Sequence, residues 1–452
     1  MIFIKDGGVR RGAWSSPSHR PRVKGIMPDG SATAHLYLPK LATTFQEGYG
    51  LGKLREDALA GLTVAVVALP LSMAIAVASG VSPAQGLFTS VVGGFVVSAL
   101  GGSRYQIGGP AGAFIVLVSA TAVRFGVEGL VLAVLLSGVM LTLAGVLRIG
   151  SLIRHIPHAV TVGFTCAIAA TILASQLKDL GGLKLVGVEP GPFFPKLAAL
   201  GQAIATLSPA TLAVGIGSTA LIFALRRWRP SWPGMLIAVV LASAAAALLR
   251  LPIETIGTRF GGIPHGLPVP RLPTANPALL LQVLPSALSF TLLGGVESLL
   301  SAKVADGLTG RKHRSNMELV AQGLANVASA LFGGICVTGT IARTATNIRA
   351  GARTPVAGIL HALFVLVFML VAAPLASYIP LSTLAGVLVV VCWNMAEKRE
   401  FARLLGDWRT GAVLLATFGV TLLKDLTFGI IAGCVVAAVF AVLNRAVPEE
   451  GA

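Results

Sequence analysis

The sequence predicts an all-α polytopic membrane protein. Of its 452 residues, 55% are hydrophobic and only 12% are charged, and the mean hydropathy of +0.83 lies above that of water-soluble domains. At least a dozen apolar stretches approach the roughly 20 residues that cross a hydrocarbon core. These stretches lack the short alternation of a membrane β-barrel. An ordinary soluble enzyme is therefore excluded.

The charge balance is strongly positive, with 35 Lys and Arg against 18 Asp and Glu and a net charge of +17. The positive residues cluster at the ends of apolar segments, as is typical of residues that hold loops in the cytoplasm. A nucleic-acid partner is therefore not expected. The sequence instead predicts a multi-pass protein of the cell inner (plasma) membrane, with the lipid bilayer as its surroundings.

No motif for catalysis, a metal or a cofactor is present. The sequence contains no HExxH pair, no GxSxG, no acidic DxxD cluster and no Walker-type GxxxxGK[ST] motif. The four cysteines, Cys166, Cys336, Cys392 and Cys434, lie in or beside apolar segments without CxxC spacing, so we expect core residues. We predict a protein that is not an enzyme and that has no metal site or cofactor.

The first 50 residues form a polar segment with several prolines and arginines and no apolar core of a signal peptide. We expect a mostly disordered cytoplasmic tail. An amphipathic run near Leu41 to Leu54 leads into the membrane.

About fourteen spans follow from Asp57 onward. They are expected at 57–80, 83–101, 110–122, 127–147, 157–176, 208–227, 231–250, 278–305, 317–335, 341–351, 354–373, 380–396, 408–423 and 425–445. If the N-terminus is cytoplasmic, four basic clusters lie on the cytoplasmic side of the membrane. Because the number of spans is even, the C-terminus is then cytoplasmic as well. These clusters are Arg148 and Arg154; Arg226, Arg227 and Arg229; Arg311, Lys312 and Arg314; and Lys398, Arg399 and Arg403.

The spans divide into two halves of about seven each. Because an odd number of spans gives the two halves opposite orientations in the membrane, we expect the halves to be inverted copies of one another. We expect a first repeat at 51–250, an external linker at 251–276, a second repeat at 277–446 and a short tail at 447–452.

Two spans are conspicuously short and fall at matching places in the two halves. The first begins at Gly108 to Phe114 and the second at Thr338 to Thr344. Paired half-length segments interrupted by Gly or Pro indicate a binding site near the middle of the bilayer.

Such a site favours an anion, because a helix that starts within the bilayer presents free backbone N–H groups and the positive end of its dipole. Small residues would let a ligand approach the backbone itself. They are Ala111, Gly112, Ala113, Gly339 and Ala342. The alternative is that these residues only let helices pack closely.

Glu297 lies deep in the long apolar span 278–305, where a carboxylate is costly unless it is paired, hydrated or protonated. Ser301 follows four residues later and faces the same side of the helix. Desolvation favours the protonated form of an acid, so Glu297 is a candidate proton carrier. Two alternatives stay open: a structural ion pair with Arg343, and a sodium ion held by Glu297 and Ser301. Arg343 itself could add positive field for an anion.

Six short motifs follow one another along the chain: Ala60 to Thr63, Pro70 to Ala74, Ile107 to Pro110, Gly323 to Asn326, Gly333-Gly334 and Thr340 to Thr344. In this order and spacing they resemble those of the SulP anion permeases, the sulfate-permease family that includes prestin and bacterial bicarbonate and dicarboxylate carriers. The similarity runs from about residue 45 to 446.

The resemblance implies a uracil-permease-like fold of seven plus seven inverted repeats, with a core domain and a gate domain. It implies an anion site between the half-helices of the third and tenth spans, capped by the first span, and transport by an elevator-like movement of the core. Carried over to this chain, the site consists of Leu71, Ile75, Ala111, Gly112, Ala113, Ile341, Ala342 and Arg343.

The chain departs from animal members of the family at Leu71 and Ile75, where they have a Gln and an aromatic residue, and at Ala342, where a Ser is common. These departures leave backbone N–H groups as the main ligands. The resemblance also implies a coupling carboxylate on the eighth span, a homodimer formed through the gate domain, and a C-terminal STAS domain. We expect a chain without that domain, because the sequence stops at Ala452.

The predicted function is secondary active transport of a small anion such as sulfate, bicarbonate or a dicarboxylate such as fumarate, coupled to protons. The alternatives are an uncoupled anion channel and a sodium-coupled symporter.

Overall fold

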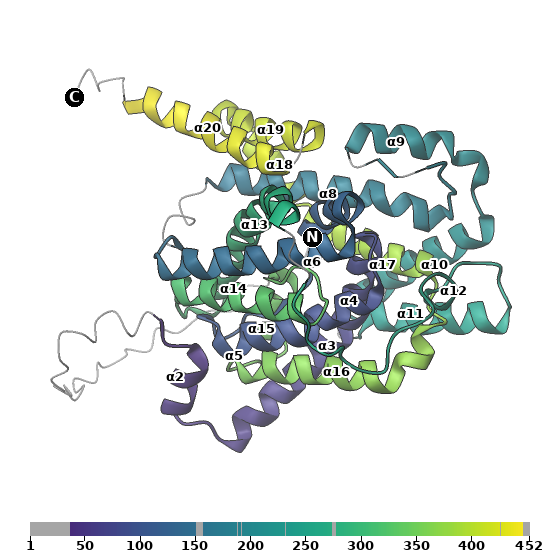
Figure 1. The fold of residues 1–452 in the computed structure, drawn as a ribbon, viewed down its shortest axis with the longest axis horizontal. Helices are drawn as coiled ribbons and strands as arrows, with labels where there is room; N and C mark the ends of the chain where they lie inside the picture. Colours follow the sequence, from purple (N-terminus) through teal and green to yellow (C-terminus); the bar gives the residue numbers. More distant parts are fainter. Residues whose placement is uncertain are drawn as a thin grey trace, which may run out of the picture. The chain divides into compact units, whose positions relative to one another are not determined.

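The computed structural model describes residues 37–150, 157–187, 189–190, 192–230, 232–273, 277–424 and 426–445. This part of the chain is mostly helical (Figure 1), so the predicted all-α membrane fold is confirmed. Eight helices are long and apolar enough to cross a membrane, and three shorter apolar helices accompany them in the described part. The number of fourteen spans stays a prediction. The tails 1–36 and 447–452 and Arg154 lie outside the described residues.

The elements of the first half end before the linker. They are α2 (Lys40–Gln46), α3 (Leu51–Ala78), α4 (Pro83–Phe88), η2 (Thr89–Gly93), α5 (Gly94–Leu100), β1 (Gly108–Gly109), η3 (Gly112–Phe114), α6 (Ile115–Val146), α8 (His158–Gly181), α9 (Phe193–Gln202), η4 (Ile204–Thr206), α10 (Pro209–Trp228) and α11 (Gly234–Leu248). A short helix, α12 (Ile256–Phe260), lies in the linker.

The second half begins with a long helix. Its elements are α13 (Pro277–Thr309), α14 (Ser315–Leu331), β2 (Thr338–Gly339), α15 (Ile341–Arg349), α16 (Val356–Ala376), α17 (Leu381–Met395), α18 (Lys398–Leu405), α19 (Trp408–Leu423) and α20 (Leu426–Arg445). The predicted spans in both halves agree with these helices to within about six residues at their ends.

Gly126 separates the two predicted spans at 110–122 and 127–147. The helix α6 runs through both, but Gly126 inside it has φ 71° and ψ −178°, which is not helical. A glycine adopts this left-handed φ without the steric cost that a side chain brings. The break therefore divides α6 into a half-length segment and a following helix, as the sequence predicts.

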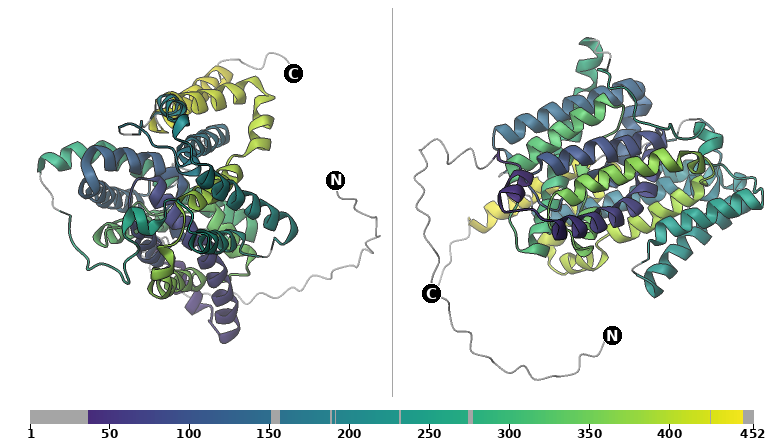
Figure 2. Two further views of the ribbon diagram at one scale, coloured as in Figure 1. Left: turned by 90° about the vertical axis from the view of Figure 1, so that its right-hand side faces the viewer. Right: turned by 90° about the horizontal axis from the view of Figure 1, so that it is seen from below.

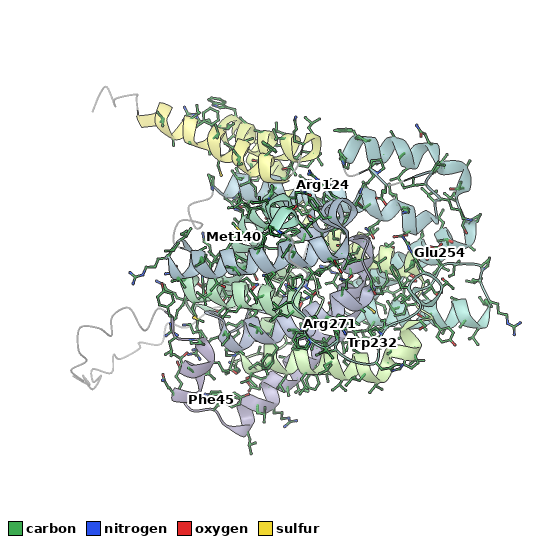
Figure 3. The ribbon with its side chains drawn as sticks, viewed as in Figure 1. Phe45, Arg124, Met140, Trp232, Glu254 and Arg271 are labelled. Carbon is green, nitrogen blue, oxygen red and sulfur yellow. The ribbon has the colours of Figure 1, made fainter. Side chains whose placement is uncertain are left out.

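The predicted amphipathic run at Leu41 to Leu54 is not one helix. It divides into α2 and the start of α3, because Gly48 has φ +83° between them. Phe45 of α2 (Figure 3) packs edge-on against Tyr49. Glu47 accepts a hydrogen bond from Arg104, which holds the pKa of the Glu47 carboxyl below its usual range. Polar contacts thus tie α2 to the loop between α5 and β1.

The helices pack in two groups. The first group contains α3 to α6 and α13 to α16; α3 lies beside α16, and α6 lies beside both α13 and α14 (Figures 1 and 2). Gly138 of α6 lies against the backbone of Gly323 in α14, where a Cβ would be 2.7 Å from the carbonyl oxygen. Small residues allow this close helix approach. The second group contains α8, α10, α11 and α17 to α20.

The two groups meet through few elements. In the first group they are α3, η3 and α6, and in the second they are α8, α11 and α17. Leu71, Ile75, Ala111 and Ala113 of the first group and Ile172 of the second belong to one buried hydrophobic cluster. The predicted site residues of the first and third spans therefore lie where the groups meet.

Candidate anion site

Two short strands bring the predicted half-helices together. β1 and β2 pair antiparallel, with Gly108 opposite Gly339 and Gly109 opposite Thr338. The Thr340 N–H donates to the Ile107 carbonyl oxygen over 3.2 Å and extends this pairing. Each strand leads within three residues into a helix, namely η3 and α15. Two helices that are more than 200 residues apart in the sequence therefore start beside the same pair of strands, β1 and β2, which we call the strand crossing.

The glycines at this crossing are required by close packing. A Cβ on Gly109 would collide with the guanidinium group of Arg343, and one on Gly339 would collide with the side chain of Gln106. A Cβ on Gly108 would lie 2.7 Å from Val97. Only glycine fits these three positions without displacing its neighbours.

Neither half-helix is capped by a side chain at its start. Ala111 precedes η3 and Thr340 precedes α15, and no side-chain hydrogen bond caps either end among the described residues. The first N–H groups of a helix have no partner within the helix. Both starts therefore retain backbone donors and a positive dipole end for a ligand.

The predicted site residues differ in exposure. Leu71, Ile75, Ala111, Ala113 and Arg343 are buried, whereas Gly112 is half-buried. Ile341 and Ala342 are exposed. The start of α15 is therefore accessible, while the first-span residues Leu71 and Ile75 are covered by neighbouring side chains.

Arg343 projects back from α15 toward the first half of the chain. It is 2% exposed, and its Nη2 donates to Ser72 Oγ of α3 over 3.0 Å. Ser72 in turn donates to the Ala68 carbonyl oxygen over 2.6 Å, so Ser90 is the donor in its 2.7 Å contact with Ser72. The Nε and Nη1 atoms of Arg343 have no hydrogen-bond partner within the described part of the chain. A buried, incompletely paired guanidinium is a source of positive field at this site.

Glu297 lies on α13 and is half-buried, and its Oε2 atom is buried without a hydrogen-bond partner among the described residues. Arg343 is its charged neighbour, but the two form no ion pair within 4.0 Å in the described structure. The ion-pair alternative for Glu297 is therefore not realised in this arrangement.

Ser301, one turn along α13, is fully buried and donates to Thr344 Oγ1 of α15 over 3.2 Å. Thr344 Oγ1 also accepts from the Ile107 N–H at 3.2 Å. Ser301 thus connects α13 to the start of α15 and to the residue before β1.

The sequence did not identify the roles of several residues that hold the site. Asn326 of α14 accepts from the Val337 N–H and donates to the Val337 carbonyl oxygen, both at 2.9 Å, which fixes the chain just before β2. Ser298 Oγ accepts from the Gly339 N–H at 3.3 Å and contacts Thr338 Oγ1 at 2.7 Å. The sequence shows only that these polar side chains occur in otherwise apolar segments. It does not show which groups they bind.

A cavity of about 690 Å³ lies elsewhere, where α2 and the first turns of α3 meet the ends of α13 and α15. It is lined by Thr44, Glu47, Lys53, Glu56, Arg104, Tyr105, Thr309, Arg311, Ile348, Gly351, Ala352, Arg353 and Thr354. None of the predicted site residues lines it. Its charged groups are largely paired, as in the contact of Arg353 with Glu56 at 2.6 Å. We therefore place the candidate site at the helix starts.

Several named proteins are similar to this one over most of the chain. The protein YvdB of Bacillus subtilis (strain 168) is 42% identical over 397 residues, which cover 87% of this chain and 74% of YvdB. The bicarbonate transporter BicA of Picosynechococcus is 32% identical over 402 residues, 86% of this chain and 70% of BicA. A sodium-independent sulfate anion transporter of Bos taurus is 29% identical, covering 88% and 71%.

Solved structures show the same fold. The transmembrane domain of a cyanobacterial BicA has a TM-score of 0.76 at 29% identity and covers 86% of this chain and 98% of that domain. The overall structure of SLC26A9 has a TM-score of 0.83 at 19% identity and covers 94% and 73%, which supports the fold alone.

A family model described as the sulfate permease family matches residues 54–417, most of the chain. This match and the related transporters confirm the resemblance predicted from the sequence motifs. The protein is a polytopic membrane protein that belongs to the sulfate permease family.

Proposed function

We propose that this protein is a secondary active transporter that carries a small anion across the plasma membrane, with a proton as the coupling ion. The substrate is an inorganic or small organic anion: sulfate, bicarbonate, or a dicarboxylate such as fumarate. Relatives named as a bicarbonate transporter and a sulfate anion transporter support this substrate class.

The observation that carries the proposal is the pair of uncapped helix starts on one strand crossing, beside a buried Arg343. The backbone N–H groups after Ala111 and Thr340 are the proposed ligands, with Gly112 and Ala342 leaving room for the anion. Arg343 is not proposed as a direct ligand. Its charge offsets part of the cost of placing an anion in the hydrocarbon region.

Glu297 is the proposed coupling group. Its buried carboxylate oxygen has no hydrogen-bond partner in the described structure, and the charged group near it is Arg343. An anion that binds near Arg343 places a second negative charge close to Glu297, which favours protonation of the carboxylate. Anion and proton binding are thereby linked, because each lowers the electrostatic cost of the other.

Sodium is the alternative coupling ion. Glu297 and Ser301 offer oxygen atoms one turn apart on α13, which suit a hard cation. Ser301 donates its hydroxyl proton to Thr344, so the lone pairs of the Ser301 oxygen point away from Thr344, as binding of a cation by this oxygen requires. A strict requirement for sodium in uptake would favour this arrangement over proton coupling.

We further propose two inverted repeats, 51–250 and 277–446, and an elevator movement of the first helix group, the core, against the second, the gate. The contacts between helices support the repeat. The contacts α3–α16, α5–α16, α10–α17 and α10–α11 correspond to α13–α6, α14–α6, α19–α8 and α19–α20 when each helix is exchanged for its counterpart in the other half. A homodimer through gate helices, and cytoplasmic positions for both termini, remain part of the proposal.

Transport by purified protein in proteoliposomes tests the proposal. Labelled sulfate, bicarbonate and fumarate are offered singly and in competition, with and without an inward proton gradient. A carrier saturates with anion and responds to the gradient. Net anion current that neither saturates nor responds to pH would favour the uncoupled channel instead.

A further inference from the structure

All four tryptophans that the structure describes lie at the ends of helices in the gate group. Trp228 ends α10, Trp232 (Figure 3) lies just before α11, Trp393 lies near the end of α17, and Trp408 begins α19. Their exposed fractions are 75%, 56%, 59% and 67%. The core helices α3 to α6 and α13 to α16 contain no tryptophan. The distribution of these large amphipathic side chains is therefore strongly uneven.

These helix ends lie on one side of the gate group. Arg226 near the end of α10 donates to Asn394 near the end of α17, and the rings of Phe223 and Trp393 are 6.3 Å apart. The helix α18 continues directly from α17 and leads into α19. His158, at the start of α8, contacts Glu400 of α18 at 3.0 Å. The four tryptophans and α18 thus belong to one surface, which we name the basic tryptophan surface.

Basic residues outnumber acidic ones on the basic tryptophan surface by seven to three. The basic residues are Arg226, Arg227, Arg229, Lys398, Arg399, Arg403 and Arg409; the acidic ones are Glu397, Glu400 and Asp407. Two of the acids are already engaged: Glu400 pairs with Arg403 at 2.6 Å, and Asp407 accepts from the Thr410 N–H at the start of α19. The surface therefore presents an excess of positive charge.

Basic groups and indole rings are interleaved. The Lys398 Nζ atom lies 3.4 Å from the centre of the Trp393 ring, and the Arg409 guanidinium lies 5.4 Å from that of Trp408. Phe401 of α18 packs inward on Phe418, with ring centres 5.4 Å apart, whereas Arg399 and Arg403 are exposed. The short helix α18 is therefore amphipathic, with its charged side away from the protein.

We propose that the basic tryptophan surface binds the head groups of anionic phospholipids. Tryptophan side chains concentrate at the boundary between hydrocarbon and water, where the ring is buried and the indole N–H stays hydrated. Lys and Arg at the same depth attract anionic head groups. The helix ends that carry this surface lie at that boundary if the gate helices cross the bilayer. The predicted orientation places the surface at the cytoplasmic leaflet.

Tryptophan quenching by brominated lipids tests this proposal on the full chain. The protein is reconstituted into vesicles of fixed phosphatidylglycerol and phosphatidylcholine content, in which either the first or the second lipid carries brominated acyl chains. Trp14 lies outside the described residues, so the background is Trp14→Phe. We expect brominated phosphatidylglycerol to quench about twofold more than expected from its mole fraction, with the excess lost at high salt.

The variant Arg227→Gln/Arg399→Gln removes two exposed charges from the surface and is expected to lower the excess quenching by about half. The matched control Arg55→Gln/Arg349→Gln removes two exposed arginines from core helices and should leave it unchanged. Equal thermal unfolding midpoints establish that both variants are folded. Quenching in proportion to mole fraction in the unsubstituted protein, or an equal loss in the control variant, would overturn the proposal.

Discussion

The single residues of the candidate anion site differ in how exposed they are. Ala342 is exposed at the start of α15, whereas Ala111 and Ala113 are buried. We predict that Ala342→Leu lowers the rate of anion uptake at least about tenfold, because the added side chain covers the backbone N–H groups that would bind the anion. Uptake of labelled anion into proteoliposomes measures this effect.

The matched control is Ala247→Leu, which adds the same side chain to an exposed alanine of α11. It should transport normally, and the thermal unfolding midpoint of both variants should match that of the unsubstituted protein. Normal uptake by Ala342→Leu would contradict binding at the start of α15.

Arg343 contributes charge to the same site. A unit charge about 8 Å from an anion contributes about 2 kcal/mol at an effective dielectric constant of about 20, which corresponds to about thirtyfold in affinity. We therefore predict that Arg343→Gln weakens anion binding by about that factor. Ser72→Ala removes a hydrogen-bond partner of Arg343 but keeps the charge, so it should weaken binding less. Equal losses in the two variants would show that Arg343 acts through packing.

Glu297 is expected to carry the coupled proton. Uptake by the unsubstituted protein should rise when the outside is acidified. Glu297→Gln mimics the protonated acid, so it should keep anion binding and anion exchange but lose accumulation driven by a proton gradient. Exchange and gradient-driven uptake are measured in the same proteoliposomes. Gradient-driven uptake at the unsubstituted rate in Glu297→Gln would exclude this residue as the carrier.

Charged residues of the site were predictable and their neutral partners were not. Glu297 is conspicuous because it interrupts a strongly apolar segment, which makes a charge expensive, whereas Arg343 was named because it lies in the motif Thr340 to Thr344. Ser72 and Ser90 are small polar residues of a kind common in membrane helices, and only the folded chain brings Ser72 to Arg343 and Ser90 to Ser72. The placement of Arg343 against Gly109 likewise depends on the pairing of two distant strands.

At the scale of elements, Asn326 fixes the strand β2 that precedes α15. Its side chain satisfies both the N–H and the C=O of buried Val337. Asn326→Ala leaves both groups without these partners, which should destabilise the protein by about 2–4 kcal/mol. We expect a lower thermal unfolding midpoint and loss of uptake, because the strand β2 that leads into α15 then lacks the hydrogen bonds that fix its position.

Asn394→Ala is the control, since Asn394 is exposed and contacts Arg226 through its side chain. It should change the unfolding midpoint little. If Asn326→Ala unfolds at the same temperature as Asn394→Ala, the Asn326 contacts do not stabilise the strand crossing.

The sequence was most informative about where helices begin and end. Breaks at Gly126 and at the paired half-length segments follow from the length of apolar runs and from the conformational freedom of glycine. The β1–β2 pair was not predictable, because two residues per strand are too few for an alternating pattern. The amphipathic α18 was also missed, since eight residues between two apolar segments resemble a loop in a hydropathy profile.

At the scale of the whole molecule, helix contacts recur when each helix is exchanged for its counterpart in the other half, and the core and gate groups are in contact through few elements. The proposed elevator needs such an arrangement, because the core can move against the gate only if few contacts between them have to break. The described tryptophans lie on or just before gate helices and on none of the core helices, an arrangement that would anchor the gate at the membrane surface while the core moves.

Distances between spin labels test whether the core moves against the gate. Labels at exposed Arg349 of α15 and Arg227 of α10 report on the distance between the groups, and labels at Arg227 and Ala402 report on the gate alone. The four native cysteines are first replaced by serine or alanine, and transport by the resulting protein is verified. In an elevator the core-to-gate distance takes two values whose proportions change when anion is added, because anion binding favours one of the two positions. The distance within the gate should keep a single value under both conditions. A single, anion-independent distance for both pairs in a transporting protein would exclude the rigid-body elevator and favour conduction through a fixed pathway.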